Sequence, residues 1–313
     1  MKCIGMYNHT YRPVGMHDER MINTMKEKII NEKMSTGKVL FSCFLCLLCL
    51  SVGQIVYQRI QCSIHNGFGN LLSTIIYIGV VIILMKIMIN KYWKMSLSEC
   101  RITLPSVPLR WIIVAIILPA IVFSIIFLLK GEWIKNDLNM NEMLYLITDH
   151  ILIKAICAGI VEEIIFRGAM LTVLEKKWGM KVAVIIPSII FTIGHLGYVS
   201  IKEYIFFLVI IAGISVGIMF SLITYESGTI WSAALVHMIW NCFTSGEILS
   251  IGRTHNESSI YSYVLQNELL TGGDYVDASI ISIIGYIVVA IIAYTLIKQK
   301  RKKAKVVVTK IVA

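Results

Sequence analysis

Residues 161–168 read VEEIIFRG and lie inside the apolar run of residues 151–173. A run of this length is sufficient for a helix to cross the ~30 Å hydrocarbon core of a bilayer. Three ionisable side chains within such a helix are costly, at roughly 2.5–3.5 kcal/mol each on insertion scales, and normally face a cavity or a partner. The stretch therefore predicts a functional site inside a membrane helix.

Helix geometry divides the three ionisable groups of this stretch. Glu163 and Arg167 are four residues apart with the acid first, which is the favourable order for a helical ion pair. Glu162 is about 100° further round the helix, so it is left free and becomes the candidate catalytic base. The alternative is that all three residues form an ion network between helices and have no catalytic role.

The composition of the whole chain is that of a polytopic membrane protein. Of 313 residues, 57% are hydrophobic and only 15% are charged, which excludes a soluble enzyme, a disordered chain and a disulfide-stabilised miniprotein. Eight apolar stretches qualify as membrane spans: 39–57, 71–89, 111–129, 151–173, 182–199, 204–224, 229–246 and 278–297. The predicted fold class is all-α, a polytopic membrane helix bundle of about eight transmembrane helices.

The spans divide the chain into regions. We expect a polar, basic N-terminal tail, three N-terminal helices, a catalytic core, a polar outer loop, and a last helix with a basic tail. These regions comprise residues 1–38, 39–129, 151–246, 247–277 and 278–313.

The basic residues are distributed unequally between the two sides of the bundle. The side with the termini carries seven Lys and Arg in residues 1–38, four in 91–110, three in 174–181 and seven from Lys298 onward, a total of twenty-one. The other side carries five. Because positive residues favour the cytoplasm, both termini are predicted to be cytoplasmic. The cluster after residue 297 suits an anionic leaflet, so the lipid bilayer is a partner and nucleic acid is not.

Two further spans carry groups that can handle a proton or donate a hydrogen bond. The fifth contains Phe191 and His195, and the seventh contains His237 and Asn241. A single histidine in an apolar helix is more often a packing residue than a catalyst. Polar groups in three spans, however, avoid the cost of desolvation only if they converge. We therefore expect a wet active site between the fourth, fifth and seventh helices.

The order Glu-Glu-x-x-x-Arg, Phe-x-x-x-His and His-x-x-x-Asn resembles the CPBP family of intramembrane proteases, which includes CAAX prenyl endopeptidases and bacteriocin-processing (Abi) proteins. The matching positions are Glu162, Glu163, Arg167, Phe191, His195, His237 and Asn241. The resemblance covers roughly residues 151–246, whereas the first three spans match by hydropathy alone.

The resemblance implies hydrolysis of a peptide bond within the membrane. Glu162, helped by His195, would activate a water molecule for attack on the scissile carbonyl. His237 and Asn241 would donate hydrogen bonds to the developing oxyanion, a contribution of ~3–4 kcal/mol for each good donor.

Glu163 with Arg167 would hold the helix and set the local electrostatic field. A zinc ion held by Glu162, His195 and His237, with water in the fourth position, is the alternative to a purely glutamate-dependent mechanism. The sequence leaves the metal question open.

Other functions compatible with the sequence are a proton-coupled transporter and a non-catalytic bacteriocin self-immunity or regulatory protein. Intramembrane ionisable groups and the helix-interrupting Pro119 and Pro187 suit a transporter, but the chain lacks the two related halves that transporters commonly show. An immunity role does not exclude proteolysis, because self-immunity members of the family retain the motifs.

The expected substrate is a membrane-associated peptide or protein. A pheromone, leader or bacteriocin precursor fits a bacterial plasma membrane, which is the expected location, better than a CAAX-like tail does.

Overall fold

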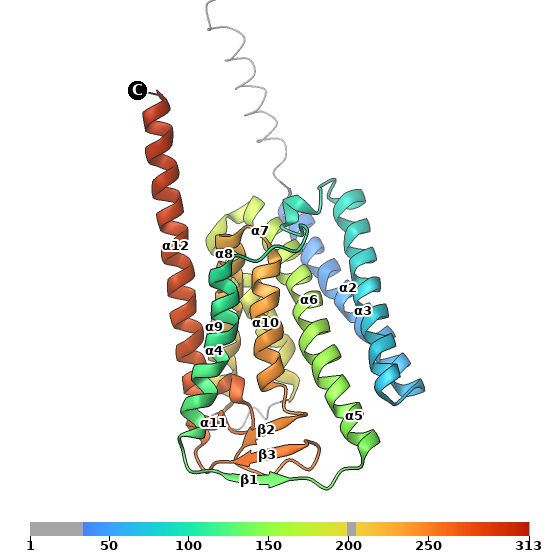
Figure 1. Ribbon diagram of the computed structural model, residues 1–313. Coiled ribbons are helices and arrows are strands. Elements are labelled where there is room, and N and C mark those ends of the chain that lie inside the picture. Colours follow the sequence, from blue (N-terminus) through green and yellow to red (C-terminus); the bar gives the residue numbers. More distant parts are fainter. Residues whose placement is uncertain (1–33, 199–204, 313) are drawn as a thin grey trace, which may run out of the picture.

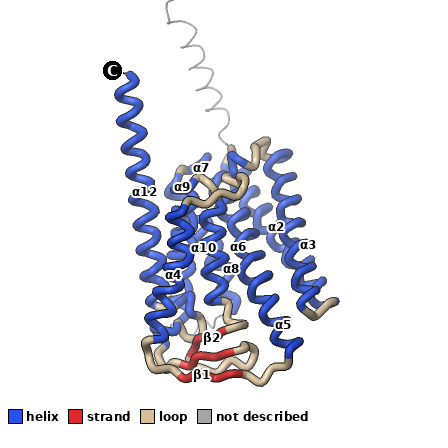
Figure 2. Tube along the Cα trace, in the orientation of Figure 1, coloured by secondary structure: helices blue, strands red, loops and turns tan. Residues whose placement is uncertain are grey.

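The computed structural model describes residues 34–198 and 205–312, most of which are helical (Figures 1 and 2). The predicted N-terminal tail, residues 1–38, lies outside these ranges except for its last five positions. The N-terminal helices are α2 (Thr36–Ser63), α3 (Gly67–Ile87) with the π-helix η1 (Met88–Tyr92), the short η2 (Ser98–Cys100) and α4 (Leu109–Phe127). The prediction of an all-α membrane bundle is confirmed.

A long, nearly continuous helical stretch carries the motif of residues 161–168. Its successive segments are α5 (Met140–Thr148), η3 (Asp149–Cys157), α6 (Ala158–Glu162), η4 (Glu163–Met170) and α7 (Leu171–Trp178), of which η3 and η4 are π-helices. The remaining long helices are α8 (Met180–His195), which continues into η5 (Leu196–Tyr198), then α9 (Ile205–Ser227), α10 (Ile230–Thr244) and α12 (Ile280–Val312).

Each of the eight predicted spans corresponds to a helix, but the helices differ in length. Six stretches within the described residues are long and apolar enough to cross a membrane: 36–63, 67–92, 109–127, 140–178, 205–227 and 280–303. The fifth and seventh predicted spans, α8 and α10, have 16 and 15 residues. At 1.5 Å per residue, α8 reaches about 24 Å, somewhat short of the hydrocarbon thickness.

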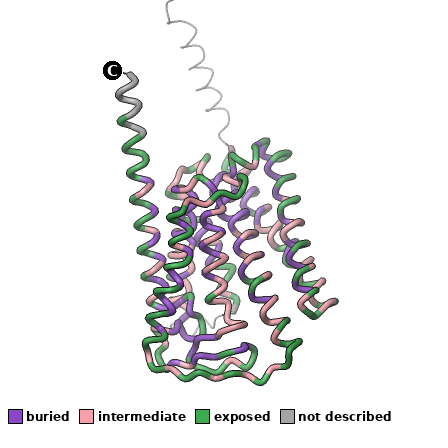
Figure 3. The backbone as a smooth tube through the Cα atoms, viewed as in Figure 1, coloured by how far each residue is buried: buried purple, intermediate pink, exposed green. Residues whose placement is uncertain are grey.

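The outward faces of the helices are apolar, as a lipid environment requires. Ile116 on α4 and Ile291 on α12 have 58% and 59% of their surface exposed, and Phe44 on α2 has 58%. Figure 3 shows this exposure along the outer helices, with buried residues concentrated in the middle of the bundle. Contact with lipid tails explains exposed apolar faces of this size, which would be unfavourable in water.

A small sheet covers one end of the bundle, here called the sheet end (Figure 1). It contains β1 (Glu132–Lys135), β2 (Leu249–Gly252) and β3 (Tyr261–Val264) in the order β1-β3-β2. β3 pairs antiparallel with β1, with Trp133 opposite Tyr263, and parallel with β2. The short helices α11 (Glu268–Thr271) and η6 (Val276–Ala278) follow. The predicted outer loop, residues 247–277, thus contains regular structure that sequence analysis did not identify.

The opposite end of the bundle, here called the basic end, is held by a charged cluster. The Glu226 carboxylate at the end of α9 is buried and accepts hydrogen bonds from the Arg110 guanidinium, at 2.8 Å, and from Trp111 Nε1, at 2.7 Å. Lys300 Nζ of α12 lies 2.8 Å from the same carboxylate. Because a buried carboxylate needs partners, Glu226 ties α4, α9 and α12 together at this end.

Two glycines allow α8 and α9 to approach closely. A methyl group at Gly213 would lie 2.8 Å from Thr192, and one at Gly217 would lie 2.7–2.8 Å from Cβ, Cα and Oγ of Ser188. Small residues four positions apart are typical of tightly packed membrane helices, because close backbone contact replaces the missing hydrophobic driving force. This packing places α9 against the helix that carries His195.

We expect Gly217→Ala to lower the yield and the thermal stability of the folded protein. The added methyl group meets the backbone of Ser188, which cannot move aside as a flexible side chain can. The cost should be about 1–3 kcal/mol, measured as a shift of the unfolding transition in detergent. Gly79→Ala on α3 is the matched control, because nothing lies within 4 Å of its added methyl group. Equal stability of the two variants would contradict this account of the packing.

Candidate active site

The six predicted site residues lie on three neighbouring helical stretches. Glu162 ends α6, Glu163 and Arg167 lie in η4, His195 ends α8, and His237 and Asn241 lie on α10. α10 packs against both α6 and η4, and α8 packs against η4.

Glu163 and Arg167 form the predicted ion pair. Arg167 Nη1 lies 2.8 Å from Glu163 Oε1, and both side chains have no exposed surface. The second guanidinium nitrogen, Nη2, donates to the carbonyl of Gly217 on α9 at 3.4 Å. A buried charge is tolerated only when it is paired and hydrogen-bonded, so these contacts explain how Arg167 can be accommodated in the interior.

Aromatic rings complete the surroundings of the guanidinium. Arg167 Cζ lies 4.7 Å from the ring centre of Phe191 on α8 and 5.2 Å from that of Phe220 on α9. Such cation–π contacts gain strength in a desolvated environment. Phe191 belongs to a motif of the sequence, whereas Phe220 was not predictable as a neighbour of Arg167, because a phenylalanine in an apolar helix carries no distinguishing signal.

The motif itself lies at a change of helix type. The chain passes from α-helix to the π-helix η4 between Glu162 and Glu163. π-Helical turns are rare and occur frequently at functional sites, because the wider turn redirects side chains that a regular α-helix would hold elsewhere. The two adjacent carboxylates therefore occupy a locally irregular backbone that sequence periodicity did not reveal.

His237 is the residue that joins the two glutamates. Its Nδ1 lies 3.1 Å from Glu163 Oε1, and its Nε2 lies 3.9 Å from Glu162 Oε2. The imidazole is almost fully buried and stacks on Phe220, with ring centres 4.8 Å apart. Because a carboxylate only accepts hydrogen bonds, Nδ1 carries the proton in the contact with Glu163, and Nε2 is directed towards Glu162.

Glu162 is less completely buried than Glu163. Its side chain is 17% exposed, against none for Glu163. The Oε2 atoms of both glutamates are buried, and within the described part of the chain neither that of Glu163 nor that of the partly exposed Glu162 has a hydrogen-bond partner. An acceptor in this state is unfavourable unless a donor reaches it, so this oxygen is suited to hold a polar hydrogen such as that of water.

His195 and Asn241 complete the set without touching the glutamates directly. Nδ1 of His195 donates to the carbonyl of Phe191 at 2.8 Å, which leaves Nε2 as the unprotonated nitrogen of the neutral ring. Nδ2 of Asn241 donates to the carbonyl of Lys154 in η3 at 2.8 Å. An amide nitrogen has two protons, so one N–H of Asn241 remains for another acceptor. This anchor on Lys154 was not predictable, since a backbone carbonyl carries no sequence signal.

The side chains do not fit the alternative zinc site. Within residues 34–198 and 205–312, no three side chains of His, Cys, Asp or Glu are grouped as metal ligands. Glu162, His195 and His237 thus do not form the three-ligand arrangement that catalytic zinc sites use.

The fold and the cluster define an integral membrane protein with an ionisable centre between packed helices. Residues 146–243 match the family model described as Rce1-like, type II CAAX prenyl endopeptidase. The matched segment contains all six predicted site residues. Comparisons with curated proteins and with solved structures found no match. The resemblance to CPBP intramembrane proteases is confirmed over this segment, and a protease of the CAAX endopeptidase type is supported at the level of the family.

Proposed function

We propose that this protein is an intramembrane endopeptidase that cleaves a membrane-associated peptide or protein. The observation that carries the proposal is the contact between helices at Glu162, Glu163 and His237. A partnerless carboxylate oxygen faces a histidine that a second carboxylate orients. General base catalysis needs this combination of an available base and a neighbouring oriented group.

The first step assigned to the site is activation of water. Oε2 of Glu162 accepts a proton from a water molecule, and the free Nε2 of His195 accepts a hydrogen bond from the same water. No direct contact joins Glu162 and His195, so the water would lie between them. The oxygen then attacks the scissile carbonyl, and Glu162 later returns the proton to the leaving amine.

The second role is stabilisation of the oxyanion. Asn241 contributes its remaining N–H, and His237 contributes Nε2–H when both ring nitrogens are protonated. In that form the imidazolium and Arg167 carry two positive charges against the two carboxylates of Glu162 and Glu163.

A comparison of peptides from cells tests the proposed function. Membrane and secreted peptides from cells that produce the wild type are compared with those from cells that produce Glu162→Gln at the same protein level. We expect a peptide that is shortened only with the wild type, which would also identify the substrate. Identical peptide profiles would overturn the proposal and favour a binding or immunity function.

We expect Asn241→Ala to slow cleavage of that peptide by around 10²-fold without abolishing it, as the loss of one oxyanion donor does. The measurement is the initial rate of cleavage by purified protein in detergent. Asn90→Ala is the matched control, because Asn90 is exposed in η1 and should leave the rate unchanged. Complete loss of activity in Asn241→Ala would show that this residue has a more essential role than the one assigned.

A further inference from the structure

The basic end of the bundle is closed over the candidate site. The segment of residues 93–108, here called the closing loop, crosses this end between α3 and α4. Its Arg101 pairs with Glu175 of α7 at 2.6 Å, and the Arg101 carbonyl accepts a hydrogen bond from the backbone N–H of Ile230 at the start of α10. Trp231 Nε1 donates to the carbonyl of Thr103 at 2.6 Å.

The closing loop also contacts the motif helix directly behind the ion pair. A methyl group added to Gly168 would lie 3.0 Å from the side chain of Ile102 and 3.2 Å from the carbonyl of Cys100. Gly168 follows Arg167, whose side chain is completely buried. The closing loop therefore covers the motif helix on the side of Gly168.

Exposure rises in the opposite direction, towards the sheet end. Glu163 is fully buried, Glu162 is 17% exposed, and Asn241 is partly exposed. His195, at the last residue of α8, is exposed. The lysine whose carbonyl anchors Asn241, Lys154, has 47% of its side chain exposed. Because α9 begins beside Gly273, near η6 and the sheet, the C-terminal end of α8 that precedes it also lies at the sheet end.

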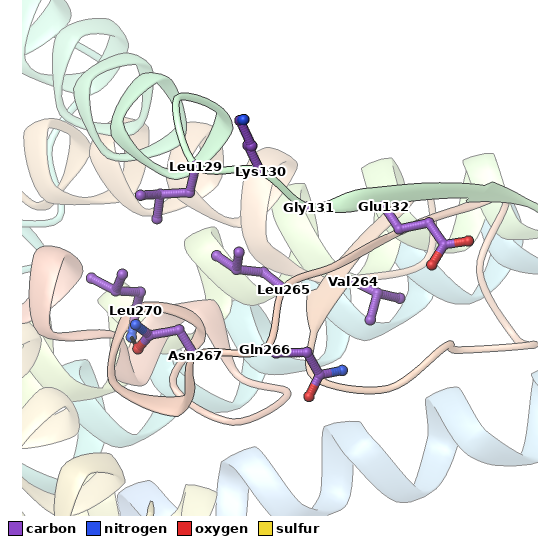
Figure 4. Close-up of a pocket in the computed structure, with 9 residues that line it drawn as sticks. All are labelled: Leu129, Lys130, Gly131, Glu132, Val264, Leu265, Gln266, Asn267 and Leu270. Atoms are coloured by element: carbon purple, nitrogen blue, oxygen red, sulfur yellow. Dashed lines mark hydrogen bonds between the residues drawn. The ribbon is translucent and has the colours of Figure 1, made fainter.

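A hollow at the sheet end lies near the histidines. Its volume is about 230 Å³, and it lies between the end of α10, β2 and η6, with Thr244, Ser245 and Asp277 among its lining residues. Ser245 Oγ donates a hydrogen bond at 2.7 Å to the carbonyl of Asn241, which lies one turn after His237 on α10. A larger hollow of about 620 Å³ lies further out, at the rim of the sheet beside Leu265 and Leu270, and no candidate catalytic residue lines it (Figure 4). The smaller hollow therefore adjoins the end of α10 that carries Asn241.

The charge distribution relates the two ends to the two sides of the membrane. The basic end carries Arg110, Lys176 and Lys300. By the span assignment from the sequence, twenty-one of the Lys and Arg residues outside the spans are expected on this side and five on the other. This asymmetry favours a cytoplasmic basic end and a sheet end on the far side of the membrane.

From these observations we infer that the active site opens away from the cytoplasm, and that its substrate is a peptide segment on the outer side of the membrane. A translocated or secreted peptide, or the outer part of a membrane protein, meets this condition. A prenylated cytoplasmic tail does not. The inference rests on the proposed proteolytic function for its substrate class, whereas the direction of opening rests on geometry and charge alone.

Two serine-to-cysteine variants test the direction of opening without any assay of activity. Ser245→Cys lies at the lining of the smaller hollow, and Ser98→Cys lies on the exposed surface of the closing loop. Both are made in a Cys62→Ser background, which removes the exposed natural thiol at the sheet end of α2. Intact cells are treated with a membrane-impermeant maleimide that adds a large mass, and labelling is compared before and after permeabilisation.

We expect Ser245→Cys to gain one label over its background in intact cells, and Ser98→Cys to gain one only after permeabilisation. The reverse pattern would overturn the inference, and so would a Ser245→Cys thiol that stays unlabelled under both conditions. In a second assay, labelling of intact cells should stop formation of the wild-type-dependent peptide in Ser245→Cys and leave it unchanged in Ser98→Cys. If wild type forms no such peptide, the proposed function fails, while the labelling result still decides the direction of opening.

Discussion

Glu162→Gln is expected to abolish cleavage while the protein still inserts and folds. Glutamine keeps the volume of the side chain and removes a carboxylate that is partly exposed and has a free acceptor oxygen. Because Glu162 holds no ion pair with Arg167, its neutralisation should leave the buried pair of Glu163 and Arg167 intact. Loss of a general base lowers rates by about 10²–10⁴-fold, and loss of a positioned water nucleophile lowers them further.

The measurement combines the cleavage rate of purified protein with its unfolding temperature in detergent. Glu132→Gln on β1 is the matched control, because Glu132 is exposed and lies outside the cluster. We expect the control to match the wild type in both measurements, and Glu162→Gln to match it only in unfolding temperature. Normal proteolysis by Glu162→Gln would show that the base lies elsewhere, and a strongly lowered unfolding temperature would show that Glu162 is a structural member of the ion network.

Arg167→Ala is expected to have the largest effect on stability of any single substitution in the core. It leaves the fully buried Glu163 carboxylate without its cation and removes the contacts with Phe191 and with the carbonyl of Gly217. Breaking a buried ion pair on one side costs about 3–5 kcal/mol, because the remaining charge is desolvated and unpaired. The yield of folded protein and its unfolding temperature should both fall, and activity should fall with them.

Two variants separate the effect of charge from the effect of packing. The double substitution Glu163→Gln with Arg167→Met removes both charges and should recover part of the lost stability. Arg253→Ala at the sheet end is the control, since Arg253 and Glu268 form a pair at the surface with both side chains partly accessible to solvent, a class that contributes about 0–1 kcal/mol. If Arg167→Ala were as stable as Arg253→Ala, the buried pair would not be structural.

Much of the fold was predictable because membrane insertion is decided by local composition. Long apolar runs identify spans without knowledge of their neighbours, so helices formed at all eight predicted positions. The sheet was not predicted, because its pairing depends on segments far apart in the chain. Its strands have four residues each, and Trp133 finds its partner Tyr263 only 130 positions later. Too few alternating residues are present in each strand to reveal a partner at that distance.

The candidate site was predictable as a set of residues and only partly as an arrangement. The cost of ionisable groups in lipid singled out Glu162, Glu163 and Arg167, and the spacing of four residues predicted the ion pair. The sequence did not indicate that His237 bonds to Glu163. It also did not indicate that Asn241 is anchored by a carbonyl group, or that a π-helix begins at Glu163.

The sequence by itself determined that this chain spans a membrane, and it predicted the candidate site residues and the side that the basic segments favour, because each follows from the transfer of individual groups between water and lipid. Only the tertiary structure decided that His237 lies between the two adjacent glutamates, and that the closing loop covers the basic end while His195 lies open at the other. These properties depend on contacts between segments far apart in the chain, such as Ile102 against Gly168. The order of residues alone does not encode such distances in any local pattern.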